Sequence, residues 1–410
     1  MIQMVTSQTL SGINDCLEDT GKSSVLIVDD NFRNLQVLGG FLKNEGLSVE
    51  FAVDGESALS WLTKKKFDLI LLDIMMPGMN GYEVCAEVKR NPETAEIPII
   101  YITAVSDTES IIKGFNLGAV DYIAKPFIQV ELLARVRTHL KAVRTKQRTL
   151  EYLARIQEHN LEISNSIAYA KNIQNAVLLT NGSTNQNLPD HFILNKPRNI
   201  LSGDFHWINK IDDNIFFAVM DCTGHGVPGA LMSILGATLL NEIIIHRKLV
   251  LPDMILEELR HKLITTLGQN KGSVSVKDGI EGSLISYNVS SSELRFAGTQ
   301  NPLIHFSGSS MEVIKADRIP IGYYEKKAKF SLRTIQIRKG DTIYMFSDGF
   351  MDQFGGPDSR KIMSGKFREL LFQYHTLPLK SQKTKLFEYL SWWQQDLEQT
   401  DDILIVGIRF

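Results

Sequence analysis

The sequence predicts an α/β protein in which a doubly wound parallel sheet is followed by a long helix and then by a sandwich of strands and helices. Three observations lead to this prediction. Short apolar strands alternate with helical segments from Ser24 onward, no glycine or proline occurs between Phe127 and Asn181, and many strand-like segments with few helices follow. Alternating strands and helices favour a parallel sheet, whereas runs of strands favour antiparallel pairing.

The composition is that of an ordinary globular chain. Of the 410 residues, 43% are hydrophobic and 22% are charged, and the formal net charge is −3. Because Lys and Arg are not in excess, nothing favours binding to nucleic acid or to an anionic membrane. The three cysteines are widely spaced, no apolar run reaches about 18 residues, and the N-terminus lacks a signal-peptide pattern. We therefore expect a cytoplasmic protein.

Changes in composition divide the chain into four parts. Residues 1–22 are polar and without a period, which predicts a flexible tail. The parallel-sheet domain is expected over residues 23–140 and a helical coiled-coil linker over 141–181. A polar stretch, NGSTNQNLPD, then leads into the last domain at 188–410.

Polar residues stand at the ends of the predicted parallel strands. VLIVDD ends in Asp29 and Asp30, FDLILLD in Asp73 and PIIYIT in Thr103, while DYIAKPF carries Lys125. Ligands bind at the carboxyl ends of parallel strands, so these side chains should lie together. The carboxylates can hold Mg²⁺ and one can accept a phosphoryl group, while the lysine and threonine offset its charge. Helix capping would explain any one of them but explains five together poorly.

The motifs LLDIMMPGMNG, YITA and DYIAKPF resemble those of the receiver domain of two-component response regulators, which has a flavodoxin-like fold. The resemblance implies that Asp73 is the phosphoacceptor and that a histidine kinase or phosphotransfer protein is the donor. It also implies that Asp30 and Asp73 contact Mg²⁺ directly, helped by the Met75 carbonyl, with Asp29 acting nearby.

The same resemblance assigns the remaining receiver residues. Thr103 and Tyr122 would form the switch pair that reports phosphorylation to the surface. Lys125 would contact the phosphoryl group, and the peptide bond to Pro126 would be cis.

A single long helix is predicted between Phe127 and Asn181. From Leu153 it carries a 3-4 spacing that predicts a short coiled coil, in which Asn160 at an a position favours a parallel homodimer. The alternative is an amphipathic helix packed back on its own domain. The basic run that starts at Lys141 is interpreted as a solvated face. The seam positions are Leu153, Ile156, Asn160, Ile163, Ile167, Ala170, Gln174 and Val177.

In the last domain, carboxylates stand beside several predicted strands. Asp221 follows the apolar run Ile215 to Met220 and precedes a glycine-rich turn, where a solvated aspartate would be the simplest interpretation of this residue alone. Several acidic strand ends with few nearby cations predict a site for hard divalent cations such as Mg²⁺ or Mn²⁺. No His/Cys spacing indicates zinc. The other carboxylates are Asp204, Asp348 and the pair Asp401 and Asp402.

The ordered motifs SGDF, DCTGHGVPGALMS, SDGFMDQFGG and TDDILIVGIR resemble those of SpoIIE-like phosphatases, the bacterial branch of the metal-dependent type 2C (PPM) protein phosphatases. The resemblance implies a four-layer αββα fold with two Mn²⁺ or Mg²⁺ ions. Asp221 would bridge both ions with help from the Cys222 carbonyl. Asp204 would bind one ion, and Asp348 and Asp401 the other. The ions would activate a water for attack on phosphorus, without a phosphoenzyme.

The expected function is a response regulator whose output is a phosphoserine/phosphothreonine protein phosphatase. By resemblance, its substrate would be a phosphorylated anti-sigma-factor antagonist of the STAS type in a partner-switching pathway. One alternative is a phosphorylation-gated docking module without turnover. A nucleotide cyclase is disfavoured, because SGDF lacks the second glycine and the glutamate of GGDEF.

Three residues near these motifs have open roles. Cys222 lacks the downstream arginine spacing of cysteine phosphatases, so a backbone role is favoured over nucleophilic attack. His225 is interpreted as capping its loop rather than as protonating a leaving alkoxide. In DGIEGS, Glu281 replaces the aspartate of the family's usual DGMD, which leaves a substrate or third-metal contact in doubt.

Overall fold

The computed structural model describes residues 22–104, 108–179, 188–269, 278–325 and 328–410. The expected flexible tail at 1–22 lies almost wholly outside these residues. The chain forms two compact units, one ending at His159 and the other beginning at Asn160. Each unit is described by itself.

The first unit is built on a five-stranded parallel sheet with the order β2-β1-β3-β4-β5. Helices cover both faces: α2 and the start of α6 pack on one apolar cluster, and α3 and α4 on another. This arrangement confirms the predicted doubly wound sheet. The strands are β1 (Ser24–Val28), β2 (Ser48–Ala52), β3 (Leu69–Asp73), β4 (Ile99–Thr103) and β5 (Asp121–Ala124). The helices are α2 (Phe32–Asn44), α3 (Gly55–Lys64), α4 (Gly81–Arg90) and α5 (Thr108–Asn116).

The predicted long helix is present as α6, which runs without a break over 51 residues, Gln129–Leu179. Its first turns bury Leu132 and Val136 in the core of the first unit. Along the predicted seam, Leu153, Ile156 and Ile163 are 52%, 55% and 57% exposed. These three side chains are therefore apolar groups that the described residues leave largely uncovered.

The end of α6 differs from the predicted seam. Gln174 is fully buried inside the second unit, where it is hydrogen bonded to Ser202 and Ser233. Leu178 packs on the apolar core of that unit. The prediction that the coiled-coil seam continues through Gln174 is therefore wrong, and the alternative of a helix packed on its own domain holds for these last turns. Spacing alone could not distinguish the two because both use the same 3-4 pattern.

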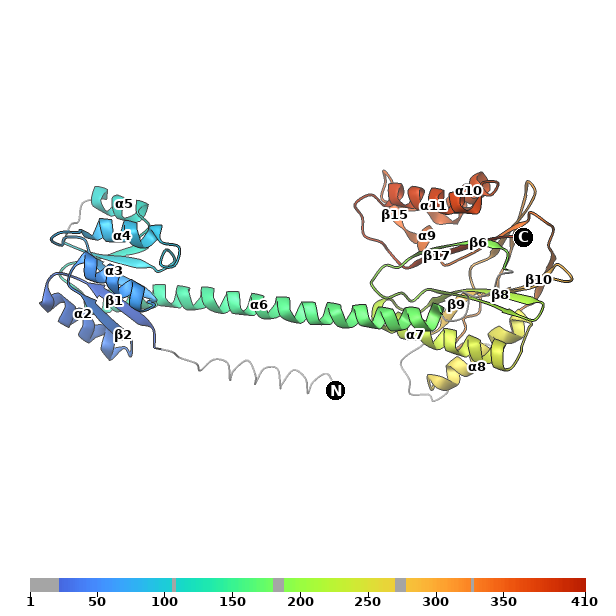
Figure 1. Cartoon of the computed structure of the whole chain (residues 1–410), viewed down its shortest axis with the longest axis horizontal. Helices are drawn as coiled ribbons and strands as arrows, with labels where there is room; N and C mark the ends of the chain where they lie inside the picture. Colours follow the sequence, from blue (N-terminus) through green and yellow to red (C-terminus); the bar gives the residue numbers. More distant parts are fainter. Residues whose placement is uncertain (1–21, 105–107, 180–187, 270–277, 326–327) are drawn as a thin grey trace. The chain divides into compact units, whose positions relative to one another are not determined.

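The second unit contains two five-stranded antiparallel sheets, ordered β13-β10-β9-β8-β7 and β12-β11-β14-β17-β6. Helices α7 and α8 cover the first sheet, and α10 and α11 cover the second (Figure 1). The strands are β6 (Asp190–Lys196), β7 (Phe205–Ile211), β8 (Asn214–Cys222), β9 (Ile280–Asn288), β10 (Glu293–Gly298), β11 (Leu303–Ser307), β12 (Ser310–Ile314), β13 (Arg333–Gln336), β14 (Thr342–Phe346) and β17 (Ile403–Arg409), with a small hairpin β15 (Phe354–Gly355) and β16 (Arg360–Lys361). The helices are α7 (Gly226–Leu240), a π-helix (Asn241–His246), α8 (Pro252–Thr266), α9 (Gly349–Asp352), α10 (Met363–Tyr374) and α11 (Leu379–Gln394).

The layer order confirms the expected four-layer αββα fold. An apolar cluster fills the space between the sheets, with Phe217 and Ile285 from one sheet and Met345 and Val406 from the other. Strand β7 was not among the strands expected from the sequence. Its polar residues Asn209 and Lys210 interrupt the apolar pattern that marks a strand in the sequence. In the structure, antiparallel pairing with β8 stabilises β7.

One helical stretch, Gly226–His246, has the length and mean hydropathy of a membrane span. In the sequence, Ser233, Asn241 and Glu242 interrupt the apolar run, so an uninterrupted apolar stretch does not mark this segment. In the structure 56% of its most apolar window is buried, and it packs against the first sheet. Its apolar character therefore serves the core of the second unit.

Candidate functional site

The first candidate site lies at the carboxyl end of the parallel sheet. Asp29 and Asp30 follow β1, Asp73 ends β3, and one carboxylate oxygen of each lies within 4.8 Å of the others. Lys125 Nζ donates to Asp73 Oδ2 at 2.6 Å and to Asp29 Oδ2 at 3.0 Å. The sheet therefore brings together the three carboxylates and the lysine predicted from the sequence.

Burial and hydrogen bonding shift the pKa values of the residues in this cluster. Burial raises the pKa of Asp73, although its hydrogen bond with Lys125 opposes the shift. Burial lowers the pKa of Lys125, but its hydrogen bonds to Asp73 and Asp29 outweigh burial and raise it. Three clustered carboxylates with one lysine leave net negative charge, which suits Mg²⁺. The Met75 amide donates to Asp73 Oδ1 at 3.2 Å, so Met75 lies beside the predicted phosphoacceptor.

Two residues of this site have no role assigned to them in the sequence analysis. Asn34 Nδ2 donates to both oxygens of Asp29, at 2.9 and 3.0 Å, and so orients that carboxylate. Gly81 lies behind Asp73, where an added Cβ would stand 2.2 Å from the Asp73 carbonyl oxygen. A glycine next to an acidic motif is a signal that sequence inspection can use, but an asparagine at the start of a helix is not.

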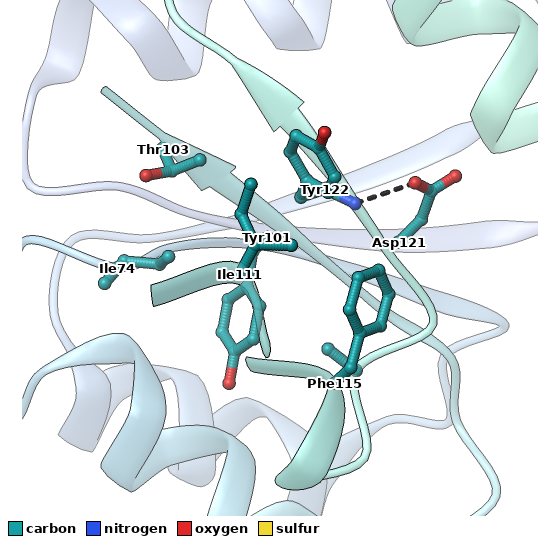
Figure 2. Close-up of a pocket in the computed structure, with 8 residues that line it drawn as sticks. Ile74, Tyr101, Thr103, Ile111, Phe115, Asp121 and Tyr122 are labelled. Atoms are coloured by element: carbon teal, nitrogen blue, oxygen red, sulfur yellow. Dashed lines mark hydrogen bonds between the residues drawn. The ribbon is translucent and has the colours of Figure 1, made fainter. Parts of the chain in front are cut away.

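Thr103 and Tyr122, the proposed switch pair, line one small pocket between β4, β5 and α5 (Figure 2). Thr103 is buried and Tyr122 is half-buried. The Tyr122 ring meets Phe115 edge to face, with centroids 6.3 Å apart, and the Arg135 guanidinium lies 5.8 Å from the same ring. The pocket thus connects the end of β4 to the surface beside α5 and α6. The Lys125–Pro126 peptide bond is cis, as expected.

The second candidate site lies where loops from both antiparallel sheets meet. Asp221 is the penultimate residue of β8 and faces Glu281 across the ladder with β9. Asp204 precedes β7, Asp348 is the N-cap of α9, and Asp401 lies just before β17. The backbones approach closely, because a Cβ on Gly349 would stand 2.0 Å from the Asp402 carbonyl oxygen, and one on Gly203 would stand 3.2 Å from the Cys222 carbonyl oxygen.

The carboxylates of this site repel one another. Burial, followed by the charges of Asp348 and Asp401, raises the pKa of Asp221 to about 8. Burial and then Asp221 raise the pKa of Asp204 well above its usual value. Burial raises the pKa values of Asp348 and Glu281 as well, with further contributions from neighbouring carboxylates.

The chemistry of these residues suits divalent cations. Asp204 Oδ2 is buried and has no hydrogen-bond partner among the described residues. A buried oxygen without a donor costs free energy unless a ligand satisfies it. All the donors in the cluster are hard oxygen atoms, which Mg²⁺ and Mn²⁺ prefer. Bound cations would also remove the mutual repulsion of the carboxylates.

We expect the metal-free protein to lose stability as the pH rises from about 4 to about 8. Between its usual pKa of 3.8 and its folded pKa of about 8, Asp221 keeps in the folded state a proton that the unfolded state has released. The folded state binds more protons in this window, so the free energy of unfolding falls with rising pH. Thermal denaturation in EDTA, compared with Asp221→Asn, measures this loss. Saturating Mn²⁺ should abolish this loss of stability. A difference in melting temperature between the wild type and Asp221→Asn that does not change with pH would contradict the expectation.

The neighbouring Asp401 and Asp402 differ in environment. Asp401 is exposed, whereas Asp402 is 3% exposed and accepts hydrogen bonds from the amides of Arg198 at 2.7 Å and Gly203 at 2.6 Å. Both oxygens of Asp402 are therefore occupied by backbone donors. Asp401 Oδ1 accepts from the Asp402 amide at 2.8 Å, and the role of Asp401 as a metal ligand stays a prediction.

His225 does not act as predicted. It occupies the N-cap position of α7, but its side chain is exposed and makes no capping hydrogen bond. The expectation that it caps its loop through the side chain is wrong, because the positive φ of Gly224 and Gly226 already shapes this turn. Cys222 is a buried free thiol whose pKa burial raises well above its usual value, so it is poorly suited to nucleophilic attack.

Two buried glutamines near the second site were also missed. Gln353 is fully buried; its Nε2 donates to the Glu398 carbonyl at 3.1 Å and its Oε1 accepts from the Thr400 amide at 3.1 Å. It therefore fixes the loop that carries Asp401. Gln174 contacts the loop that carries Asp204. Glutamine gives little sequence signal because most glutamines lie on exposed surfaces.

Comparisons with known proteins match the two ends of the chain to two different families. The response regulator receiver domain family matches residues 25–137, and the family of stage II sporulation protein E (SpoIIE) matches residues 211–410. Among solved structures, the SiaA-PP2C domain of Pseudomonas aeruginosa is 29% identical with a TM-score of 0.54, covering 62% of this chain and 98% of that domain.

Curated relatives match over shorter stretches. A probable cyclic di-GMP phosphodiesterase of Vibrio cholerae is 42% identical over 134 residues, which is 32% of this chain and 29% of that protein. The DNA-binding response regulator MtrA of Mycobacterium tuberculosis is 40% identical over 123 residues, 30% of this chain and 53% of that protein. The matched region thus spans about half or less of the length of these curated relatives. The chain combines an N-terminal response regulator receiver domain with a C-terminal SpoIIE phosphatase domain of the PP2C type.

Proposed function

We propose that this chain is a response regulator in which phosphorylation of Asp73 controls a Mn²⁺- or Mg²⁺-dependent phosphoserine/phosphothreonine protein phosphatase. The observation that carries the proposal is the group of mutually repelling carboxylates at the second site, where the buried Asp204 Oδ2 atom has no hydrogen-bond partner among the described residues. The proposed phosphodonor is a histidine kinase or phosphotransfer protein. The proposed substrate is a phosphorylated STAS-type anti-sigma-factor antagonist, and two buried free thiols support a cytoplasmic location.

In this proposal, the residues that would hold two cations are Asp204, Asp221, Asp348 and Asp401. The cations, when bound, lower the pKa of a coordinated water and neutralise the phosphoryl charge. The chain's own part is to hold these carboxylates rigidly. Asp221 is fixed by a buried strand, and the Ser347 amide donates to the Leu404 carbonyl at 2.9 Å, which joins the Asp348 and Asp401 loops.

A measurement of phosphate release distinguishes this proposal from the alternative of a docking module without turnover. Purified protein with Mn²⁺ should hydrolyse p-nitrophenyl phosphate and remove phosphate from a phosphoserine STAS protein, and EDTA should stop both reactions. A protein that binds the phosphorylated partner without releasing phosphate would be a docking module. No described feature of the site favours that outcome, since every expected carboxylate is present.

The proposed route between the two domains is the helix α6. A helix transmits a change only if it has two states that the receiver can bias. Pairing of two copies through the exposed residues Leu153, Ile156 and Ile163 would supply such states, with Asn160 setting the register. A differential of about 3 kcal/mol would change the ratio of the states more than a hundredfold.

Replacing Ile163 and Ile167 together with Asp should convert the proposed dimer to a monomer. Charges at core positions of a paired helix cannot be buried without a large cost. The receiver should still accept phosphate, but the phosphatase rate should no longer respond to it. Light scattering and phosphatase assays measure these effects.

A matched control places the same two charges away from the seam, as Leu161→Asp with Asn165→Asp. Leu161 is 63% exposed and lies outside the 3-4 spacing, so this variant should keep both the dimer and the response. If the Ile163 and Ile167 variant remains dimeric, or still responds, α6 is a passive tether.

A further inference from the structure

An exposed apolar surface lies at the end of α11, beside the hairpin of β15 and β16 (Figure 1). Trp392 is 60% exposed, although its ring contacts that of Tyr389, with centroids 5.6 Å apart. Two further apolar side chains come from neighbouring segments: Phe354 in β15 and Leu397 after α11, each 42% exposed. Phe354, Trp392 and Leu397 are called the apolar rim below. Large apolar side chains that gather on one exposed surface mark interaction sites, whereas scattered ones do not.

Backbone contacts hold the segments of the apolar rim against one another. The Gly356 amide donates to the Trp393 carbonyl at 2.8 Å, and Trp393 Nε1 donates to the Gln353 carbonyl at 3.2 Å. A Cβ on Gly355 would stand 1.8 Å from the Trp393 carbonyl oxygen, so only glycine allows this approach. The end of α11 and the hairpin therefore form one continuous surface.

The apolar rim adjoins the proposed metal centre. Gln353, directly before Phe354, is hydrogen bonded at 3.1 Å to the backbone of residues 398 and 400. These two residues lie between Leu397 and Asp401, one of the proposed metal ligands. Asp348, another of these ligands, is the N-cap of the short helix α9 that leads to Phe354. The rim therefore borders the metal centre on the side of two of its proposed ligands.

The charge around the apolar rim is negative. The segment WWQQDLEQTDD, residues 392–402, contains four acidic residues and no lysine or arginine. Of these, Asp396, Glu398 and Asp401 are exposed. Like charges brought together at an interface reduce affinity, whereas opposite charges speed association. A partner that covers the rim is therefore expected to surround its apolar contact with basic side chains.

We propose that the apolar rim is a docking surface for the phosphoprotein substrate, which covers it with an apolar patch flanked by basic side chains. This inference rests on the proposed function, since it takes the metal centre to be the phosphatase site. A stable protein interface covers about 800 Å² of each partner, so a protein whose phosphoserine reaches the metals extends over the neighbouring surface. Trp392 is the expected anchor, because tryptophan is enriched among the residues that dominate binding energy.

Phe387 provides a matched control on the same helix. It is 48% exposed, so it also presents an aromatic side chain to solvent. It lies five residues before Trp392, which at about 3.6 residues per turn places the two about 140° apart around α11. Phe387→Ala therefore removes an exposed ring from α11 without changing the apolar rim.

The first experiment compares Trp392→Ala with Phe387→Ala in the full chain with Mn²⁺. The substrates are a phosphoserine STAS protein and p-nitrophenyl phosphate, which has no protein surface to contact the rim. For Trp392→Ala we expect kcat/KM on the phosphoprotein to fall at least about tenfold, with p-nitrophenyl phosphate hydrolysis within about twofold of the wild type. Phe387→Ala should stay within about twofold on both substrates.

The second experiment measures binding without turnover. Biolayer interferometry with the phosphoserine STAS protein uses chains that also carry Asp221→Asn, so that the phosphoprotein is not consumed. Trp392→Ala should weaken binding at least about tenfold and Phe387→Ala less than about twofold. Asp396→Lys, which reverses one charge beside the rim, should slow association.

Three results would overturn the inference. One is an equal effect of Trp392→Ala and Phe387→Ala on phosphoprotein binding, and another is the absence of binding when the rim is unaltered. The third is a change of oligomeric state in Trp392→Ala, seen by light scattering, with unchanged phosphoprotein binding, which would make the rim a contact between copies of this chain.

Unfolding and failure of the proposed function are recognised separately. If Trp392→Ala loses p-nitrophenyl phosphate hydrolysis as well, its fold is damaged, and Leu397→Ser then serves as the rim variant with the same selective loss expected. If the proposed function fails, the wild type releases phosphate from neither substrate. The binding comparison still decides the role of the apolar rim in that case, because it requires no turnover.

Discussion

Replacing Asp221 with Asn should reduce phosphatase turnover by more than about 100-fold at saturating Mn²⁺, because loss of the proposed metal ligand should exceed the effect of losing an orienting partner. The substitution keeps the shape of the side chain but removes its anionic charge. Since Asp348 and Asp401 already repel this carboxylate, the metal-free variant should melt at a higher temperature than the wild type at pH 8. A stable and inactive protein is therefore expected.

The control for this variant is Asp213→Asn. Asp213 is exposed in the turn between β7 and β8, where it accepts a hydrogen bond from Ser290 Oγ at 2.8 Å that an asparagine can also accept. Its turnover should stay within about twofold of the wild type. Substantial Mn²⁺-dependent activity in purified Asp221→Asn would refute the metal assignment. A variant that is inactive because it has unfolded would be recognised by its lower melting temperature.

Replacing Asp73 with Ala should reduce phosphorylation of the chain by acetyl phosphate and Mg²⁺ to background. Asp73 pairs with Lys125 at 2.6 Å, whereas Asp29 is held by Asn34 and Asp30 is exposed. Lys125 also pairs with Asp29, at 3.0 Å, but Asn34 donates to both Asp29 oxygens. Asp73 is therefore the carboxylate most closely paired with the cation that can neutralise the incoming phosphoryl group. Phosphate-affinity gel electrophoresis measures the modified fraction.

Loss of this modification should also remove the response of the phosphatase rate to acetyl phosphate. Asp54→Asn is the matched control, because Asp54 caps α3 through the Ser57 amide at 2.7 Å and asparagine caps equally well. It should be phosphorylated like the wild type. Modification of Asp73→Ala to the wild-type level would place the phosphoacceptor elsewhere.

Much of the architecture follows from local pattern. Buried strands such as Ile215 to Met220 are continuous apolar runs, and the helix between Phe127 and Asn181 is marked by the absence of glycine and proline. Carboxylates beside these strands predict cation chemistry because strand ends in such folds point to shared edges. Residue type and spacing along the chain therefore determined the two-domain fold and the candidate carboxylates of both sites.

Only the tertiary structure distinguished the roles of chemically equal residues. Asp401 and Asp402 are adjacent in the sequence, yet Asp402 is occupied by the amide of Gly203, 199 residues away. Gln174 matches a coiled-coil seam but is buried against Ser202, 28 residues later. Hydrogen bonds between residues so far apart in the sequence depend on which loops the packed sheets bring together. The 3-4 and alternating patterns of apolar residues describe only local structure, so they do not predict these contacts. The sequence by itself determined which groups the sites contain; packing decided which of them are tied to backbone donors and which hold the loops in place.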